Sequence, residues 1–240
     1  METNRNKVKV PFWLTMLLLS GTALSGLVLA KSVKAGTSAS QTQARSIRTD
    51  SGTEGTQPDG YQVGDIVANF RLKNVDGRML SLSDFTSQKG VIIVFQSNHC
   101  PFSKAYEDRI IALDRKFNTQ GYPVLAINPS DPTSYPDDNI DQMQYRARTK
   151  GYTYPFLSDD KQVVAQAFGA SRTPQVFVLK NNGAGRFMVQ YLGTIDDNPQ
   201  DPAGVTKRYV DDAVSNLLSN KPVVITTTKA IGCAIKWREM

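Results

Sequence analysis

The strongest hydrophobic pattern in the chain is a run of five apolar residues, Val91-Ile92-Ile93-Val94-Phe95. An unbroken run rich in β-branched residues is typical of a strand that is buried on both faces of a sheet. Shortly after it, apolar residues recur every third or fourth position and predict a helix that begins at Pro101 and reaches about Asn118. Proline suits the first helical position, where its missing N–H would have no intrahelical partner. The pattern therefore predicts a core strand that leads directly into a helix, with Cys100 at the junction.

The rest of the chain alternates between the two periodicities. Strand alternation on both sides of an Asp-Gly turn at 76–77 predicts a hairpin from 68–72 and 79–82, and a short helix follows at 83–85. Later strands are predicted at 123–127, 154–157, 175–179 and 187–191, and helices at 141–150, 162–168 and 205–218. This order predicts an α/β sandwich in three layers, with helices on both faces of a sheet and the hairpin as an N-terminal extension.

The first 60 residues have a different composition. Arg5, Lys7 and Lys9 precede an uncharged, leucine-rich stretch at 10–30, and small-residue cleavage patterns end at Ala30 and Ala35. Residues 1–35 are therefore predicted to be a signal peptide, or a membrane anchor formed by 10–30 if they are not cleaved. In both cases the main domain is expected outside the cytoplasm, in a periplasmic or other extracytoplasmic space. Residues 36–60 have almost no large apolar side chains and are predicted to be a flexible linker. A single domain at 61–222 and a C-terminal tail at 223–240 follow.

The net charge of +6 belongs largely to the N-terminal segment. Five of the 28 basic residues and one of the 22 acidic residues lie in 1–35, which leaves a balance of about +2 for the remainder. The remainder has no run of basic residues interleaved with aromatic residues, so nucleic-acid binding is not expected. Contact with a membrane is expected only through the N-terminal segment.

Cys100 is the best candidate for a reactive group. At a helix N-terminus, free backbone N–H groups and the helix dipole favour negative charge. A thiol in this place is expected to lose its proton more easily than a free cysteine, whose pKa is about 8.5, and the thiolate is the reactive form. The neighbouring His99 could also favour the thiolate when protonated, or it could be a solvated loop residue. The chain has one histidine and two cysteines, so neither a metal site nor a cofactor is expected.

Several segments resemble a known family. The strand followed by Cys-Pro-Phe-Ser at 100–103 and a helix, together with Arg172-Thr173-Pro174 before a later strand, resembles the thioredoxin superfamily. The segments at 98–101, 193–197 and 231–237 are similar to the redoxin branch that holds the alkyl hydroperoxide reductase/thiol-specific antioxidant (peroxiredoxin-like) proteins. The resemblance runs from about Tyr61 to Trp237. It implies a thioredoxin-like fold with a central mixed sheet.

The resemblance also implies roles for residues outside the Cys100 motif. Thr173-Pro174 is expected to carry a cis peptide that faces Cys100. Ser97 matches the hydroxyl residue that peroxiredoxins have three positions before the reactive cysteine, and Arg172 is a plausible counterpart of their essential arginine. With these residues, the thiolate would attack a peroxide oxygen or a disulfide sulfur while Arg172, Ser97 and the helix N-terminus hold the developing charge.

The chain also departs from both patterns of the superfamily. Ser103 occupies the place of the second cysteine of thioredoxins, which makes an exchange of disulfides within the motif impossible. Val94 stands where thioredoxins have a buried acid, and Ile93 stands where peroxiredoxins have a proline. These departures keep three functions open: a thiol peroxidase or antioxidant, a thiol-disulfide oxidoreductase that acts on exported proteins, and a non-catalytic binding module.

Cys233 is the other cysteine of the sequence. It could form a disulfide with Cys100 and so resolve the oxidised cysteine, or this bond could be a structural link worth about 4–5 kcal/mol. A third hypothesis is that Cys233 is a packed tail residue and that an external thiol resolves the oxidised Cys100. The expected partners are a peroxide or a protein disulfide as substrate and an external thiol as reductant.

Four pairs of adjacent acidic residues are spread over the later part of the chain. Such pairs in turns and at helix starts are typical of caps and solvated faces. The pair at 196–197 is the best candidate for a function because it lies in a segment with the family resemblance. The pairs are Asp137-Asp138, Asp159-Asp160, Asp196-Asp197 and Asp211-Asp212.

Overall fold

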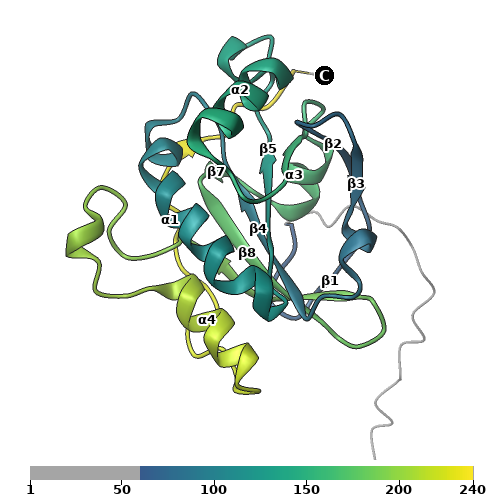
Figure 1. The fold of residues 1–240 in the computed structure, drawn as a ribbon, viewed down its shortest axis with the longest axis vertical. Helices are drawn as coiled ribbons and strands as arrows, with labels where there is room; N and C mark the ends of the chain where they lie inside the picture. The colour runs from purple at the N-terminus through teal and green to yellow at the C-terminus, as the bar shows by residue number, and fades with distance from the viewer. Residues whose placement is uncertain (1–59, 240) are drawn as a thin grey trace, which may run out of the picture. The chain divides into compact units, whose positions relative to one another are not determined.

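The computed structural model describes residues 60–239 (Figure 1). The predictions of a leader at 1–35 and of a linker up to residue 59 lie outside the described residues. Within 60–239, no helix combines the length and the apolar character needed to cross a membrane.

The described residues form four α-helices and ten strands. The helices are α1 (Pro101–Phe117), α2 (Ile140–Lys150), α3 (Val163–Phe168) and α4 (Tyr209–Leu218). The strands are β1 (Ile66–Val67), β2 (Arg71–Asn74), β3 (Met79–Ser81), β4 (Gly90–Phe95), β5 (Val124–Asn128), β6 (Phe156–Ser158), β7 (Arg172–Thr173), β8 (Gln175–Asn181), β9 (Phe187–Gly193) and β10 (Cys233–Ala234).

Eight of these strands make one mixed sheet in the order β1-β9-β8-β4-β5-β6-β2-β3. The contacts of β5 with β4 and β6 are parallel, and the other pairs of neighbours are antiparallel. Every residue of β4 is buried, as its unbroken apolar run predicts. The predicted hairpin is present as β2 and β3 and extends the sheet beyond β6.

Helices cover both faces of this sheet, which confirms the three-layer prediction. Alternate residues of β4 belong to two separate cores. Ile92 and Val94 pack with α1, α2 and α4. Ile93 and Phe95 pack with α3 and with Tyr61 and Val67. Figure 1 shows α1 and α4 lying across one face of the central strands. Because β4 is held from both sides, the chain that leaves its C-terminal end has a fixed position.

The last helix begins later than its pattern predicts. We expect a helix over 205–218, but α4 spans Tyr209–Leu218. The Asp197 side chain accepts the backbone N–H of Thr206 at 2.9 Å, and the Asp197 N–H donates to the carbonyl of Lys207 at 3.1 Å. Backbone groups that could begin the helix are therefore bonded to the preceding loop.

The prediction that the acidic pairs are caps or solvated faces is wrong for Asp138 and Asp196, which are buried and bond to distant segments. Asp159 is also buried, but its carboxylate accepts the N–H of Ala165 in the first turn of α3 at 2.8 Å, as a helix cap does. Asp196 accepts hydrogen bonds from Arg109 at 2.7 Å and from the hydroxyl of Tyr106 at 2.9 Å. Burial raises the pKa of Tyr106 to about 12. The contacts of Asp196 join the loop after β9 to α1, so its role is structural.

Candidate active site

Cys100 lies at the end of the short connection between β4 and α1. It is the N-cap residue of the helix, in extended conformation, with Pro101 at the first helical position. The backbone N–H of Ser103 points at the Cys100 Sγ from 3.5 Å, and the Ser103 hydroxyl accepts the N–H of Ser97 at 3.2 Å. Ser103 thus fixes the loop between strand and helix, and its amide is directed at the sulfur as expected for a helix N-terminus.

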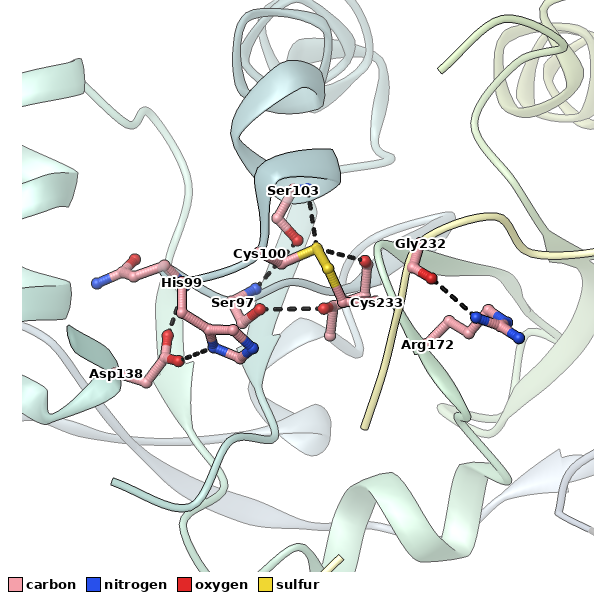
Figure 2. Close-up of a disulfide and its surroundings, with 10 residues drawn as sticks. Ser97, His99, Cys100, Ser103, Asp138, Arg172, Gly232 and Cys233 are labelled. Atoms are coloured by element: carbon pink, nitrogen blue, oxygen red, sulfur yellow. Dashed lines mark hydrogen bonds and ion pairs between the residues drawn. A yellow bond between two sulfur atoms is a disulfide. The ribbon is translucent and has the colours of Figure 1, made fainter. Parts of the chain in front are cut away.

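Cys100 forms a disulfide with Cys233, which comes from the C-terminal tail (Figure 2). The two Cα atoms are 6.0 Å apart, within the usual range for a disulfide. Cys233 is therefore not an unbonded tail residue. Cys100 is fully buried in this oxidised state, whereas Cys233 is partly exposed.

The Thr173–Pro174 peptide is cis, as the family resemblance predicts. The carbonyl oxygen of Thr173 lies 3.0 Å from the Cys100 Sγ, so the loop faces the sulfur directly. The hydroxyl of Ser97 lies 3.0 Å from the Thr173 hydroxyl. The side chain of Ser97 is thus joined to the proline loop in this state.

The tail crosses the proline loop as a strand. β10 pairs antiparallel with β7, so that Cys233 lies opposite Thr173. A guanidinium nitrogen of Arg172 donates to the carbonyl of Gly232 at 2.9 Å. Figure 2 shows this contact on the far side of the disulfide from His99. In the oxidised state Arg172 therefore binds the tail next to Cys233.

Gly232 makes the closest approach between tail and loop. A Cβ at this position would lie 2.2 Å from the Thr173 carbonyl oxygen and 3.0 Å from the Pro174 nitrogen. These are backbone atoms, which cannot rotate away. Only glycine allows the tail to lie flat against the proline loop.

His99 is turned toward an acid. Its Nδ1 pairs with the buried carboxylate of Asp138, and its ring stacks on Tyr135 with centroids 3.8 Å apart. Asp138 also accepts hydrogen bonds from the backbone of Asn98 and from the side chain of Asn128. The Asp138 carboxylate thereby ties the loop before Cys100 to the segment that follows β5.

Sequence reasoning missed Asp138 and Gly232 as site residues. Asp138 belongs to an acidic pair that resembles a helix cap, and its burial depends on a contact 40 positions away along the chain. Gly232 lies in the resembling segment 231–237, but its approach to Pro174 becomes visible only once the tail is folded back.

Together the strand–helix junction, the cis-proline loop and the cysteine pair define a redoxin with the thioredoxin fold, which is a class of thiol-based oxidoreductases. A sequence model of the AhpC/TSA family matches residues 63–188. This is more than half of the chain, and the chain belongs to the AhpC/TSA family.

Curated relatives and solved structures agree with this assignment. The thiol-disulfide oxidoreductase ResA of Geobacillus thermodenitrificans is 26% identical over 145 residues, which are 60% of this chain and 79% of ResA. Peroxiredoxin Q of Oryza sativa subsp. japonica is 28% identical over 164 residues, covering 61% of this chain and 65% of the relative.

Two crystal structures cover most of the described domain. A hypothetical protein of Sinorhizobium meliloti 1021 has a TM-score of 0.69 and 30% identity, and covers 77% of this chain and 99% of its own. An uncharacterized conserved protein of Geobacillus kaustophilus has a TM-score of 0.69 and 32% identity, with 75% of this chain and 94% of its own covered. The match to the AhpC/TSA family and the likeness to ResA and peroxiredoxin Q favour an enzyme over a non-catalytic binding module.

Proposed function

We propose that the protein is an exported thiol peroxidase in which Cys100 reduces a small hydroperoxide and Cys233 resolves the product. The observation that carries this proposal is the disulfide between these two residues at the N-terminus of α1. The sequence contains two cysteines, so this pair holds all of its thiol chemistry.

In the first step, the Cys100 thiolate attacks the terminal oxygen of ROOH. An S–O bond forms and the O–O bond breaks, and the leaving RO⁻ takes up a proton to give ROH. The sulfur is oxidised to a sulfenic acid and the peroxide is reduced. The Ser103 N–H, which points at the sulfur, supports the thiolate before the attack.

In the second step, Cys233 attacks the sulfenic sulfur. The S–S bond forms, the S–O bond breaks, and water leaves with the thiol proton of Cys233. The product is the disulfide described above, with β10 docked on β7. No second protein molecule is needed to resolve the sulfenic acid.

In the third step, an external dithiol reduces the disulfide. Its thiolate attacks Cys233, which is partly exposed, rather than Cys100, which is fully buried. Cys100 then leaves as the thiolate, a good leaving group at a helix N-terminus. The second thiol of the reductant releases Cys233 and becomes part of the reductant's own disulfide.

The other residues have supporting roles in the proposal. Ser97 and the Thr173-Pro174 loop shape the space beside the sulfur, and the contact between the hydroxyls of Ser97 and Thr173 joins them to each other. Arg172 exchanges the carbonyl of Gly232 for the developing negative charge when the tail moves away. His99 modulates the thiol through the loop that Asp138 holds.

Export is proposed from the sequence of residues 1–35 and is supported by the disulfide, since such bonds persist in oxidising compartments. Fractionation of cells that express the full chain tests it. Export predicts the protein outside the cytoplasm, either free after cleavage or with the membrane if 10–30 remain as an anchor. Recovery from the cytoplasm alone contradicts export.

A second candidate is a thiol-disulfide oxidoreductase, which the likeness to ResA favours. In this case the Cys100 thiolate attacks a disulfide of an exported protein, and Cys233 releases the mixed disulfide. The same two cysteines serve both reactions. The burial of Cys100 beneath the tail favours a small oxidant over a folded protein.

Stopped-flow measurement of peroxide consumption separates these functions. The reduced wild type is expected to consume peroxide rapidly, and Cys100→Ser should be slower by at least about 100-fold, because the nucleophile is lost. Cys233→Ser should complete one turnover and then stop at a sulfenic acid that dimedone traps. If the wild type leaves peroxide untouched but reduces a protein disulfide through Cys100, the second candidate is correct.

A purely structural disulfide predicts a different result. Structural disulfides in secreted proteins have reduction potentials below about −300 mV. Titration against redox buffers is expected to give a potential well above that value for a catalytic bond. A potential below it, together with an unreactive Cys100, contradicts both functions.

A further inference from the structure

The C-terminal tail is fastened to the domain on both sides of Cys233. Before the cysteine, the hydroxyl of Thr228 lies 2.6 Å from the Tyr191 hydroxyl and accepts the N–H of Thr194 at 3.0 Å. The backbone of Thr228 donates to the carbonyl of Leu192 at 3.0 Å. A Cβ on Gly193 would lie 2.1 Å from the Thr228 hydroxyl oxygen, so the tail is seated closely on β9.

After the cysteine, Gln162 holds the tail by its backbone. Its amide nitrogen donates to the carbonyls of Lys236 at 2.9 Å and Pro129 at 2.8 Å. Its amide oxygen accepts the backbone N–H of Arg238 at 2.8 Å. The Gln162 side chain is fully buried, and its backbone has a left-handed φ of 60°. A non-glycine residue in this conformation is uncommon, which suggests that the side chain is needed there.

Between these two attachments, the tail is held by contacts around the disulfide itself. Ile235 donates its N–H to the carbonyl of Ser171 at 3.0 Å, and Arg172 binds Gly232. These contacts depend on the strand pairing of β10 with β7. The attachments at Thr228 and Gln162 do not include either cysteine, and nothing in their geometry requires the S–S bond.

We propose that Gln162 and Thr228 are positioning residues that keep the tail docked when the Cys100–Cys233 bond is reduced. The docking itself does not depend on the proposed function, but its effect on catalysis does. With both attachments kept, Cys233 stays beside Cys100 and captures the sulfenic acid before an outside thiol or a second peroxide reaches it. A tail tethered only through residue 222 would supply Cys233 at an effective concentration on the order of millimolar, far below that of an oriented group.

Docking also defines the substrate class more narrowly. If the tail remains attached at Thr228 and Lys236, only the short span 229–235 can move away from Cys100. Such an opening admits hydrogen peroxide or a small organic hydroperoxide. It excludes a folded protein disulfide, which must bring two bonded sulfurs and their backbone up to Cys100.

Hydrogen exchange of the full chain, in its oxidised and its dithiothreitol-reduced forms, tests the docking directly and requires no peroxide activity. The amides of Thr228 and Arg238 are expected to stay protected in both forms, because their acceptors belong to the two attachments. The amide of Ile235 is expected to lose protection on reduction. Loss of protection at all three amides would overturn the proposal and leave the proposed function standing.

The catalytic consequence is measured by adding one equivalent of peroxide to reduced protein in the presence of dimedone. The ratio of dimedone adduct on Cys100 to internal disulfide is expected to rise at least tenfold in Gln162→Met and in Thr228→Val. Asn74→Ala is the matched control: Asn74 is also buried and accepts a backbone N–H, from Phe156, but does not contact the tail. The control should lose stability and keep the wild-type ratio.

Three outcomes separate the possibilities. A raised ratio in both tail variants alone supports the positioning role. A wild-type ratio in Gln162→Met, or an equal rise in Asn74→Ala, overturns it. If Cys100 is not oxidised in any variant, the peroxidase function fails, and hydrogen exchange still decides whether the tail stays docked.

Discussion

The two sulfurs of the site are held by very different parts of the molecule. Cys100 lies between a strand whose six residues are all buried and the first turn of a helix of 17 residues. Cys233 lies in a tail whose strand has two residues, one partly buried and one exposed. The position of Cys100 follows from local sequence and core packing, whereas that of Cys233 follows from separate backbone contacts with distant segments.

The two cysteines accordingly have different parts in the proposed chemistry. The rigid junction supplies a nucleophile with a fixed amide hydrogen directed at it, and so needs no rearrangement to react. The tail supplies a partner on a short span that can leave and return between the attachments at Thr228 and Gln162, because this span is held by backbone hydrogen bonds such as that of Ile235 with Ser171. Changes to the tail should therefore alter resolution, and changes to the junction should alter stability.

The largest effect is expected from Gly232→Ala. The new Cβ would lie 2.2 Å from the Thr173 carbonyl oxygen, and neither backbone can yield without lifting the tail from β7. The rate at which the internal disulfide forms after peroxide addition is expected to fall by more than about tenfold, as measured by quenching with an alkylating reagent and mass spectrometry. Ala234→Gly, two positions further along the tail, is the control and should form the disulfide at the wild-type rate. An unchanged rate in Gly232→Ala would mean that the tail is not seated against the proline loop.

Removal of a buried acid tests the junction. Asp138→Ala deletes the acceptor for Asn98, Asn128 and His99, and leaves buried donors without a partner. The free energy of unfolding, measured with urea, is expected to fall by about 2–4 kcal/mol. Asp137→Ala changes the exposed neighbouring carboxylate and should cost less than about 0.5 kcal/mol. Equal losses in the two variants would show that Asp138 does not hold the junction.

The pH dependence of stability reports on the turn that supports Gln162. Burial raises the pKa of Asp159 from 3.8 to about 6, even though its carboxylate accepts the N–H of Ala165 at 2.8 Å. Because the folded state then binds more protons than the unfolded state, this contribution is greatest below about pH 4 and is lost as the pH rises through about 6. The free energy of unfolding is expected to decrease by up to about 3 kcal/mol over this range.

Asp159→Asn should remove this decrease, and Asp160→Asn, at the exposed neighbouring position, should retain it. Urea unfolding curves at pH 4, 5, 6 and 7 measure the effect. If the free energy of unfolding of Asp159→Asn decreased with pH as steeply as that of the wild type, the pH dependence would belong to another group.

The smallest effect is expected from Arg238→Ala. The Arg238 side chain is about half exposed and lies 3.7 Å from Asp131, and it donates to the carbonyl of Asp160 at 3.2 Å. Pairs of this kind contribute less than about 1 kcal/mol. Because the backbone N–H of residue 238 still reaches Gln162, disulfide formation should keep its wild-type rate. A large slowing would show that the side chain, rather than the backbone, fastens the tail.

The sequence predicts the junction well because its signals are local. The apolar run of β4 and the periodicity of α1 are sufficient to place Cys100 within one residue of a helix start. The cis peptide at Thr173–Pro174 follows from the family resemblance and not from the residues themselves, because proline alone allows either isomer.

The positions of the tail, of Arg172 and of the start of α4 could not be predicted, because they depend on contacts between groups that are far apart in the sequence. Gln162 is one glutamine among several in the chain, and its contact with Arg238 spans 76 positions. The start of α4 is delayed by the contacts of Asp197, which follow from the folded loop and not from the periodicity of 205–218. The family resemblance implies that Arg172 lies beside the sulfur, whereas in the oxidised state its side chain binds the tail.

A single turnover with hydrogen peroxide tests the central claim, that Cys100 and Cys233 act as a nucleophile and its resolving partner. One equivalent of peroxide is added to the reduced chain, the reaction is quenched by alkylation, and the cysteines are assigned by mass spectrometry. We predict that a Cys100–Cys233 disulfide forms in proportion to the peroxide consumed. Alkylated Cys100 together with unconsumed peroxide would contradict this claim.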